Sequence, residues 1–423
     1  MIELKSLSNG VRVVLEELPY VRSIAFGIYV KNGSSNETEQ EEGISHFIEH
    51  MVFKGTATRS SKQIAEDMDE LGGQINAYTT KEYTCYHFRT LDKHFGRALD
   101  ILSDMFLNSK FDEKDIQKER NVIIEEINMY DDDPEERVQD ILQNIIWNGS
   151  SLAHPILGTE ETISNFNSNK IKEYFKSHYR NDNTVISAVG NFKTEEMLEK
   201  LERVFGGWKT GRHDTIMPET PVYNSGFSSE EKDTEQLHLC ITFPSFRRDH
   251  EMKYPYAVLN TVFGGGMSSM LFQKVREENG LSYTIYSFPT SYEKTGSFTI
   301  YTALNPSQAE SVCTIVKECI CDIKTGGISD TLLNKTKTQL ISGFIIGNES
   351  TLSRMTSNGV SVLMLGYAKE QEETIKEAEK ASAADVKFAA ESIFNFDLIS
   401  IAACGNTKEI DSEKLINIFR KNS

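Results

Sequence analysis

One short motif near the N-terminus constrains the chain more than any other feature. Residues 46–50 read HFIEH, and they lie within Glu42–Phe53, where apolar residues recur at the spacing of one helix face. At about 100° per residue, His46, Glu49 and His50 fall together on the opposite face. Solvated helix faces are usually built from Lys, Glu and Gln, whereas two imidazoles at i, i+4 can bind one metal ion. The motif predicts a helix that packs by one face and binds metal by the other.

The length and charge of the chain indicate its class. At 423 residues it exceeds what one hydrophobic core usually holds, so two domains of about 200 residues are expected. The net charge of −18 argues against nucleic acid as a partner and against anionic membranes. The six cysteines form no C-x2-C pair, no basic and apolar leader is visible, and no apolar run reaches about 18 residues. We therefore expect a soluble protein of the cytoplasm that does not bind membranes.

A change in composition predicts the domain boundary. Residues 211–232 fall in a stretch rich in Gly, Pro, Ser, Thr and charged residues with little periodicity, which is typical of a linker. Residues 1–210 would then form an N-terminal metal-binding domain, and residues 233–423 a C-terminal domain.

The second domain repeats features of the first. Residues 260–265 (NTVFGG) align with residues 50–55 (HMVFKG), and residues 298–301 (FTIY) align with residues 83–86 (YTCY) at a similar offset. Two weak matches at nearly one offset indicate an internal duplication. In the second copy, the places of the two histidines and the glutamate are taken by Tyr256, Asn260 and Leu259. Only the first copy is therefore expected to bind metal.

A third metal ligand is predicted on a long helix over Asp112–Tyr130. Catalytic zinc usually has three protein ligands and one position left for water. Glu119 and Glu126 lie two turns apart at the border of the apolar stripe of this helix, whereas Glu125 points away from it. The stripe comprises Ile116, Ile123, Ile127 and Tyr130. Periodicity alone does not choose between Glu119 and Glu126.

The HxxEH motif and the later E-x6-E element resemble the insulinase/pitrilysin metallopeptidases, and most closely the processing-peptidase branch. The similarity covers essentially the whole chain, in the segments GISHFIEHMVFKGT (43–56), GGQINAYT (72–79), ERNVI (119–123) and LFQKVRE (271–277). The resemblance implies an α+β fold of two duplicated α/β sandwich domains, each a mostly antiparallel sheet with helices packed on it. It also implies a homodimer that encloses a chamber.

The resemblance implies roles for the predicted site residues. The later glutamate, Glu126, would bind one Zn²⁺ ion together with His46 and His50, and Glu119 would orient a ligating imidazole. Glu49 shares the ligand face but is not needed as a ligand, so we expect it to move a proton from water to the leaving amine. Manganese or cobalt could occupy the same ligands.

A peptide-binding strand is expected in the first half. Gln74–Thr80 follows two glycines and reads as a strand with an open edge, which can pair with an extended peptide. By resemblance, the residues that bind substrate there are Asn76, Ala77 and Tyr78.

The second half is expected to contribute to the same reaction. By resemblance, Arg276 and Tyr283 reach the substrate, and the Tyr283 hydroxyl lies close to the developing oxyanion. Related chains often carry Arg where this chain has Met270, which affects an ion pair at that corner rather than the chemistry.

An acidic segment at residues 131–136 (DDDPEE) has two interpretations. Pro134 suits the first turn of a helix, and the aspartates before it suit the helix N-terminus. Alternatively, Glu136 and Asp140 share one helix face, and acidic residues at matching positions of the processing-peptidase branch bind a substrate arginine. The second interpretation predicts a preference for basic residues near the cleavage site.

Two functions are compatible with these features. The leading hypothesis is a zinc endopeptidase that acts on unfolded peptides or presequence-like segments. The alternative is a non-catalytic peptide-binding or structural subunit, since the resembled family includes members that have lost the motif. The intact set of His46, Glu49, His50 and Glu126 favours the enzyme.

Overall fold

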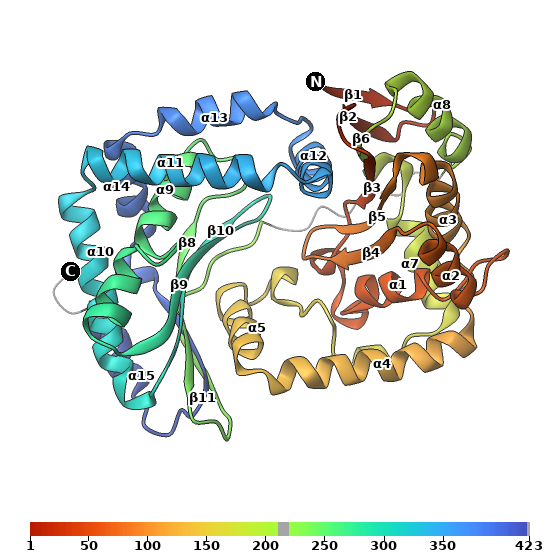
Figure 1. Cartoon of the computed structure of the whole chain (residues 1–423). Helices are drawn as coiled ribbons and strands as arrows, with labels where there is room; N and C mark the ends of the chain where they lie inside the picture. Colours follow the sequence, from red (N-terminus) through yellow and green to blue (C-terminus); the bar gives the residue numbers. More distant parts are fainter. Residues whose placement is uncertain (210–219, 421–423) are drawn as a thin grey trace. The chain divides into compact units, whose positions relative to one another are not determined.

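The computed structural model describes residues 1–209 and 220–420, which form two compact units, each described below by itself (Figure 1). Unit 1 comprises Met1–Ile127, His154–Pro218 and Ile345–Gln371, as far as these are described. Unit 2 comprises Asn128–Ala153, Glu219–Phe344 and Glu372–Ser423, with the same restriction.

Unit 1 is built on a six-stranded sheet of order β1-β2-β6-β3-β5-β4, in which β2 and β6 pair in parallel and the other pairs are antiparallel. Its strands are β1 Ile2–Ser6, β2 Arg12–Glu17, β3 Ser23–Val30, β4 Gln74–Thr79, β5 Thr84–Leu91 and β6 Thr184–Gly190. The strand expected at Gln74–Thr80 is β4, which pairs with β5 in an antiparallel hairpin. Strand β4 lies at one edge of the sheet, and β1 lies at the other.

Helices cover both faces of this sheet. Phe26 and Ile28 of β3 pack into the core beneath the main helices, whereas Ala25 and Tyr29 point to the opposite face and pack against α12. Helix α12 approaches closely, because a Cβ atom at Gly359 would lie 2.3 Å from the Tyr29 ring. The helices of unit 1 are α1 Ile44–Val52, α2 Ser61–Glu70, α3 Phe95–Asn108, α4 Glu113–Asp132 (whose last residues belong to unit 2), α6 Glu160–Ser164, α7 Ser168–His178, α8 Thr194–Phe205 and α12 Thr351–Leu365.

Unit 2 contains a five-stranded sheet of order β7-β11-β8-β10-β9, with β7 and β11 in parallel. Its strands are β7 Phe227–Glu231, β8 Leu237–Ser245, β9 Ser282–Ser291, β10 Gly296–Leu304 and β11 Ser400–Gly405. Its helices are α5 Pro134–Ile146, α9 Lys253–Phe263, α10 Ala309–Gly326, α11 Asp330–Gly347, α13 Gln371–Lys380, α14 Ala383–Ile393 and α15 Ser412–Arg420. The strand order repeats β2-β6-β3-β5-β4 of unit 1, which is the topology an internal duplication produces.

Each half of the chain contributes one helix to the unit built mainly from the other half. Helix α5 comes from the first half but packs on β11 and β8 of unit 2, and α12 comes from the second half but packs on β3 and β6 of unit 1. Each sheet is apolar on both faces and needs a second cover, which the other half supplies. The compact units therefore differ from the expected domains at residues 1–210 and 233–423.

The expected linker at residues 211–232 also needs correction. Its residues 211–219 lie outside the described residues. Further along, Phe227–Glu231 forms strand β7, which pairs with β11 over five residues. Composition pointed to a linker because β7 is a polar strand at the edge of its sheet, where one side of the backbone needs no partner strand.

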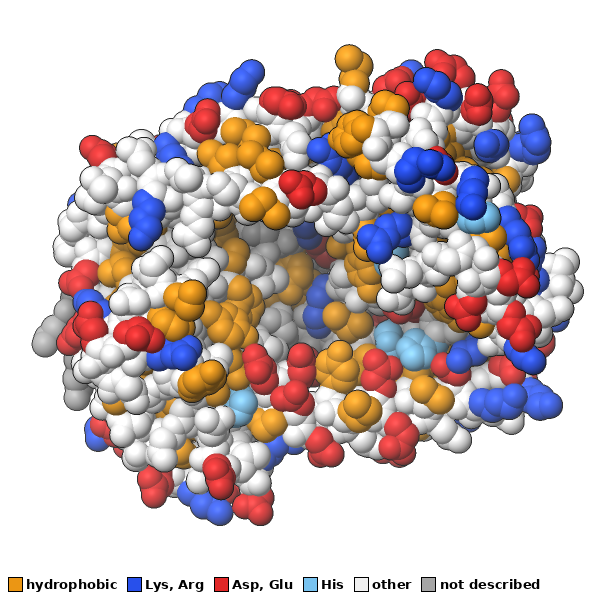
Figure 2. Space-filling model, viewed as in Figure 1, with side chains coloured by type: hydrophobic (Ala, Val, Ile, Leu, Met, Phe, Trp, Pro, Cys, Tyr) orange, Lys and Arg blue, Asp and Glu red, His pale blue; other side chains and the backbone are white. Residues whose placement is uncertain are grey.

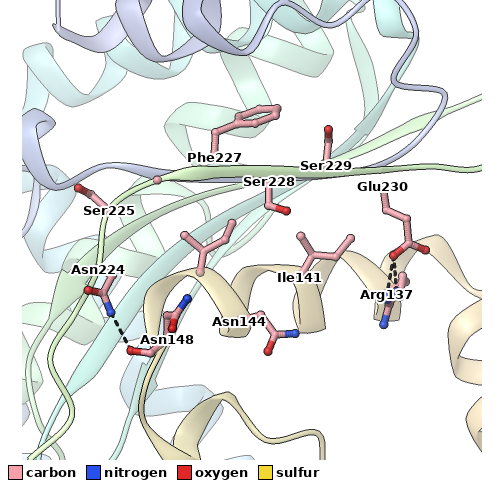
Figure 3. A pocket seen from close by; sticks show the side chains of 12 residues that line it. Arg137, Ile141, Asn144, Asn148, Asn224, Ser225, Phe227, Ser228, Ser229 and Glu230 are labelled. Atoms are coloured by element: carbon pink, nitrogen blue, oxygen red, sulfur yellow. Dashed lines mark hydrogen bonds and ion pairs between the residues drawn. The ribbon is translucent and has the colours of Figure 1, made fainter. Parts of the chain in front are cut away.

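The outer edges of β2 and β7 differ between the two sheets. In unit 1 the edge of β2 is covered by β1, whereas no described strand pairs with the outer edge of β7. A groove of about 610 Å³ lies between α5 and β7 (Figure 3). An ion pair between Arg137 and Glu230, 2.7 Å apart, marks one end of the groove, and Asn148 and Asn224 mark the other.

Among the described residues, no helix combines the length and the apolar character that crossing a membrane requires. All six cysteines are free thiols, and five of them are buried.

Candidate metal centre

Helix α1 carries the HxxEH motif and begins at Ile44 after Gly43, whose φ of +86° favours glycine. Its apolar face is fully packed, as the motif predicted: Phe47 and Ile48 are inaccessible to solvent. The Glu37 carboxylate accepts hydrogen bonds from the Gly43 and Ser45 amides, both 2.8 Å long, at the start of the helix. Unpaired amides at a helix N-terminus favour such an acceptor. The helix is thereby held at the end from which His46 projects.

Helix α4 brings Glu126 to the two imidazoles. The Oε2 atom of Glu126 lies 3.8 Å from Nε2 of His46 and 3.5 Å from Nε2 of His50. The imidazole ring centroids are 4.6 Å apart. Among the residues that the structure describes, these three side chains form the only group of this kind that could hold a metal ion. In the space-filling view, histidine and acidic side chains meet at the surface of unit 1 beside α4 (Figure 2).

The donor atoms fit a zinc ion. Two ligands about 2.1 Å from one ion at a tetrahedral angle lie about 3.4 Å apart, close to the Nε2–Oε2 distances observed here. Burial, followed by the proximity of His50, lowers the pKa of His46 to about 3. Its imidazole is therefore neutral at pH 7, as a metal ligand must be. Three protein donors leave a fourth position for water or substrate.

Glu119 lies behind the two imidazoles. Its Oε1 is 2.8 Å from Nδ1 of His50, and its Oε2 is 2.6 Å from the Lys54 ammonium. Burial opposes the charge of this carboxylate, but its bonds with His50 and Lys54 outweigh burial and lower its pKa. An anion at this position fixes the His50 ring so that Nε2 faces Glu126. Nδ1 of His46, by contrast, is buried and has no hydrogen-bond partner among the described residues.

Glu49 lies on the same side of α1 and is partly exposed. Its Oε2 accepts a hydrogen bond of 2.5 Å from the Thr79 hydroxyl on β4. Burial raises the pKa of Glu49, and the bond from Thr79 offsets part of that rise. A carboxylate with a raised pKa, one bonded oxygen and one free oxygen is suited to accept and return a proton.

Comparisons with known proteins agree with this arrangement. Residues 12–160 match the sequence model of "Insulinase (Peptidase family M16)", and residues 165–340 match that of "Peptidase M16 inactive domain". An uncharacterized zinc protease of Bacillus subtilis is 42% identical over 408 residues, covering 96% of this chain and 99% of that protein. The chain belongs to the insulinase family, peptidase family M16. A second zinc protease, from Streptomyces coelicolor, is 33% identical over 417 residues, which is 97% of this chain and 91% of that protein.

Solved structures show the insulinase-family fold at lower identity. A protease from Helicobacter pylori superposes with a TM-score of 0.91 at 20% identity, covering 96% of this chain and 99% of the other. A protein from Pseudomonas fluorescens, described as a peptidase M16 inactive domain, gives a TM-score of 0.89 at 19% identity over 96% and 98% of the two chains. The predicted α+β fold of two duplicated domains is therefore confirmed.

The remaining predicted residues of this insulinase-family chain lie on both units. Asn76, Ala77 and Tyr78 are on edge strand β4 of unit 1. In unit 2, the Arg276 guanidinium lies 4.3 Å from the centroid of the Tyr283 ring, and the Tyr283 side chain is 75% exposed.

The acidic residues expected to bind basic substrates lie on α5 of unit 2. Helix α5 begins at Pro134 with Asp133 as its N-cap, as the capping interpretation predicted. Glu136 is exposed and Asp140 is half-buried. Burial and the neighbouring acids raise the pKa of Glu136. The two interpretations of the acidic segment are compatible, because different residues carry them.

Several contributors to the site were not identified from the sequence. Glu37, Lys54 and Thr79 each contact the motif helix or its partners, yet none of them was given a role from the sequence. Lys54 and Thr79 lie in the segments 43–56 and 72–79 that carry the family resemblance, but the resemblance did not single them out. One predicted member of the apolar stripe was wrong: Tyr130 is 44% exposed, because the first segment of unit 1 ends at Ile127 and the last turn of α4 extends beyond it.

Proposed function

We propose that this insulinase-family chain is a zinc-dependent endopeptidase that hydrolyses unfolded peptides, including presequence-like segments. The observation that carries the proposal is the grouping of His46, His50 and Glu126, whose donor atoms lie within 4.8 Å of one another, beside the Glu49 carboxylate. Relatives that match nearly the full length are named as zinc proteases.

The roles within the site follow from the contacts. His46, His50 and Glu126 would hold the zinc ion, which when bound supplies Lewis acidity for peptide hydrolysis. Glu119 orients His50 through Nδ1 and is itself held by Lys54. Glu49 takes a proton from the attacking water at its free Oε1 and returns it to the leaving amine.

The substrate contacts are proposed on both units. The outer edge of β4, at Asn76, Ala77 and Tyr78, would pair with the extended peptide, which needs little sequence specificity. Arg276 and Tyr283 would contact the substrate from unit 2, with the phenol hydroxyl donating to the oxyanion.

We further propose a preference for basic residues, bound by Glu136 and Asp140. Two peptides that differ only by Arg or Ala near the cleavage site provide the test. We expect the wild type to cleave the Arg peptide faster and Glu136→Gln to lose this difference, whereas equal cleavage of both peptides by the wild type rejects the preference.

We also propose that the chain forms a homodimer and is located in the cytoplasm. Six free thiols suit a cytoplasmic location.

The catalytic proposal is tested by peptide hydrolysis with a chelator and with Glu49→Gln. We expect the chelator to abolish hydrolysis and zinc to restore it. Glu49→Gln should lower kcat by roughly 10²- to 10⁴-fold while the bound zinc, measured by metal analysis, stays unchanged. Full activity of the variant would exclude Glu49 as the base.

One comparison favours a second candidate. Residues 165–340 match a family model described as an inactive domain, so a non-catalytic peptide-binding or structural subunit is the alternative. A wild-type chain that binds zinc and unfolded peptide but hydrolyses no peptide would establish that alternative.

A further inference from the structure

Thr79 contacts the proposed base directly. Its hydroxyl donates a hydrogen bond of 2.5 Å to Oε2 of Glu49, and no other described residue donates to this carboxylate. Thr79 is the last residue of β4 and is half-buried. Nothing in the HxxEH motif itself therefore holds the Glu49 side chain; a residue 30 positions away does so.

The backbone of Thr79 faces the open edge of the sheet. The Thr80 amide donates to the Tyr83 carbonyl across the hairpin, and the direction of backbone groups alternates along a strand. The amides and carbonyls of Ala77 and Thr79 therefore point away from β5, towards the edge where no described strand lies. The Ala77 amide fits this assignment, because it donates to the side chain of its neighbour Asn76 at 2.9 Å. An incoming peptide strand would replace Asn76 as that partner.

We propose that Thr79 is a positioning residue that couples peptide binding at the edge of β4 to the orientation of Glu49. The inference rests on the proposed peptidase function. A peptide that pairs with the Thr79 backbone fixes φ and ψ there, and the fixed backbone limits the χ1 rotamers open to the hydroxyl-bearing side chain. The hydroxyl holds Oε2 of Glu49, so that Oε1 stays directed at the water. Pairing as far as Thr79 therefore raises kcat as well as lowering KM.

The test compares Thr79→Val with Thr79→Ser. Valine keeps the branched shape and removes the hydroxyl, whereas serine keeps the hydroxyl. Thr84→Val is the matched control, because Thr84 lies opposite Thr79 in the hairpin and its hydroxyl bonds to the Asn32 carbonyl instead. The two substrates are a 20-residue unstructured peptide and a 6-residue fragment around its cleavage site. For each variant, kcat and KM, bound zinc, thermal unfolding and the Kd of the long peptide for zinc-free protein are measured.

We expect Thr79→Val to lower kcat for the long peptide by about 10- to 100-fold, the size of a small misplacement of a reacting group. Zinc content, peptide Kd and KM should change less than about twofold. The kcat advantage of the long peptide over the short one should largely disappear in this variant. Thr79→Ser and Thr84→Val should stay within about threefold of the wild type.

Two results would overturn the inference. One is a wild-type kcat in Thr79→Val with either peptide; the other is a loss confined to KM and peptide Kd, which would make Thr79 a binding residue. If Thr79→Val loses zinc or does not fold, Thr79→Ser becomes the deciding variant. A loss of kcat in Thr79→Ser as large as that in Thr79→Val also rejects the role of the hydroxyl. Failure of the proposed function is distinguishable, because the wild type itself would then show no chelator-sensitive hydrolysis.

Discussion

The two units share one strand order, but the corresponding helices α1 and α9 serve different purposes. In unit 1, α1 presents His46, Glu49 and His50 to a partly open surface. The corresponding positions of α9 in unit 2 are closed: Tyr256 donates to the Ser297 carbonyl at 3.1 Å, Leu259 is fully buried, and Asn260 accepts from Ser287 at 2.8 Å. The scaffold supplies a helix beside an edge strand in both units. A reactive site is formed only in unit 1, where the polar side chains of the helix can still bind a metal ion or water.

The hydroxyl contacts make this comparison sharper. Ser287 on β9 donates to Asn260 much as Thr79 on β4 donates to Glu49. In unit 2 the acceptor is a neutral amide and the contact attaches the helix to the sheet. In unit 1 the acceptor is a carboxylate beside two imidazoles, so the same kind of contact acts on a reactive group.

The largest expected effect comes from giving unit 1 the residue that unit 2 has. His50→Asn removes one of three proposed ligands, so zinc bound per chain should fall from about one to near zero and hydrolysis by more than about 10³-fold. Metal analysis and peptide cleavage measure both. The reciprocal Asn260→His in unit 2 is the control and should gain no zinc, because Tyr256 and Leu259 offer no further ligand. Full zinc content in His50→Asn would show that His50 is not a ligand and that the two helices do not differ in this way.

A medium effect is expected from the buried acid at the start of α1; at the start of α9 the acceptor is instead the His250 imidazole, whose Nδ1 accepts from the Met252 amide at 3.1 Å. Burial raises the pKa of Glu37 from 4.5 to about 7, although its bonds from Ser45 and Gly43 oppose the rise. The folded chain then binds one proton more than the unfolded chain between pH 4.5 and 7. The contribution of Glu37 to stability is therefore full below this window and is lost as pH rises through it, by about 3 kcal/mol.

Urea unfolding of the metal-free chain at pH 4.5 and pH 8 measures this effect. Glu37→Gln cannot titrate, so its unfolding free energy should lack this part of the decline. Parallel pH profiles for the wild type and the variant would show that Glu37 titrates alike in both states.

The smallest effect is expected for Ser229→Pro, which tests the bare edge of β7. The Gly226 carbonyl accepts from Ile401, and the Lys232 amide donates to Gly405, so alternation directs the Ser228 groups to β11 and the Ser229 groups outward. Proline at an outward position of an edge strand removes no ladder bond. Ser229→Pro should cost less than about 1 kcal/mol, whereas the neighbouring Ser228→Pro should cost about 3 kcal/mol or more. Equal losses in chemical denaturation would mean that both edges of β7 are paired in solution.

Local structure was well predicted because its causes are local. The apolar spacing in α1 and the Asp133–Pro134 start of α5 each depend on residues within a few positions. The choice between Glu119 and Glu126 was not local. Both sit at the border of one stripe, and only the packing of α4 against α1 directs the first to Nδ1 and the second to Nε2 of His50.

The exchange of α5 and α12 could not be predicted from the sequence for a similar reason. Periodicity reveals that a helix has an apolar face, but it does not reveal which of two similar sheets that face will cover. Glu37 and Thr79 illustrate the same limit on a smaller scale, because an ordinary glutamate or threonine gains its role only from a partner brought close by the fold.

The exchanged helices have a consequence for how the chain matures on the ribosome. All six strands of the first sheet have been synthesised once Gly190 is made, whereas the helix that covers their second face ends at Leu365. The sheet that supports α1 must therefore wait, with one apolar face uncovered, while most of the second half is translated. Severing the chain between the halves would leave two fragments that each lack a helix, and we expect soluble protein only when both are produced together.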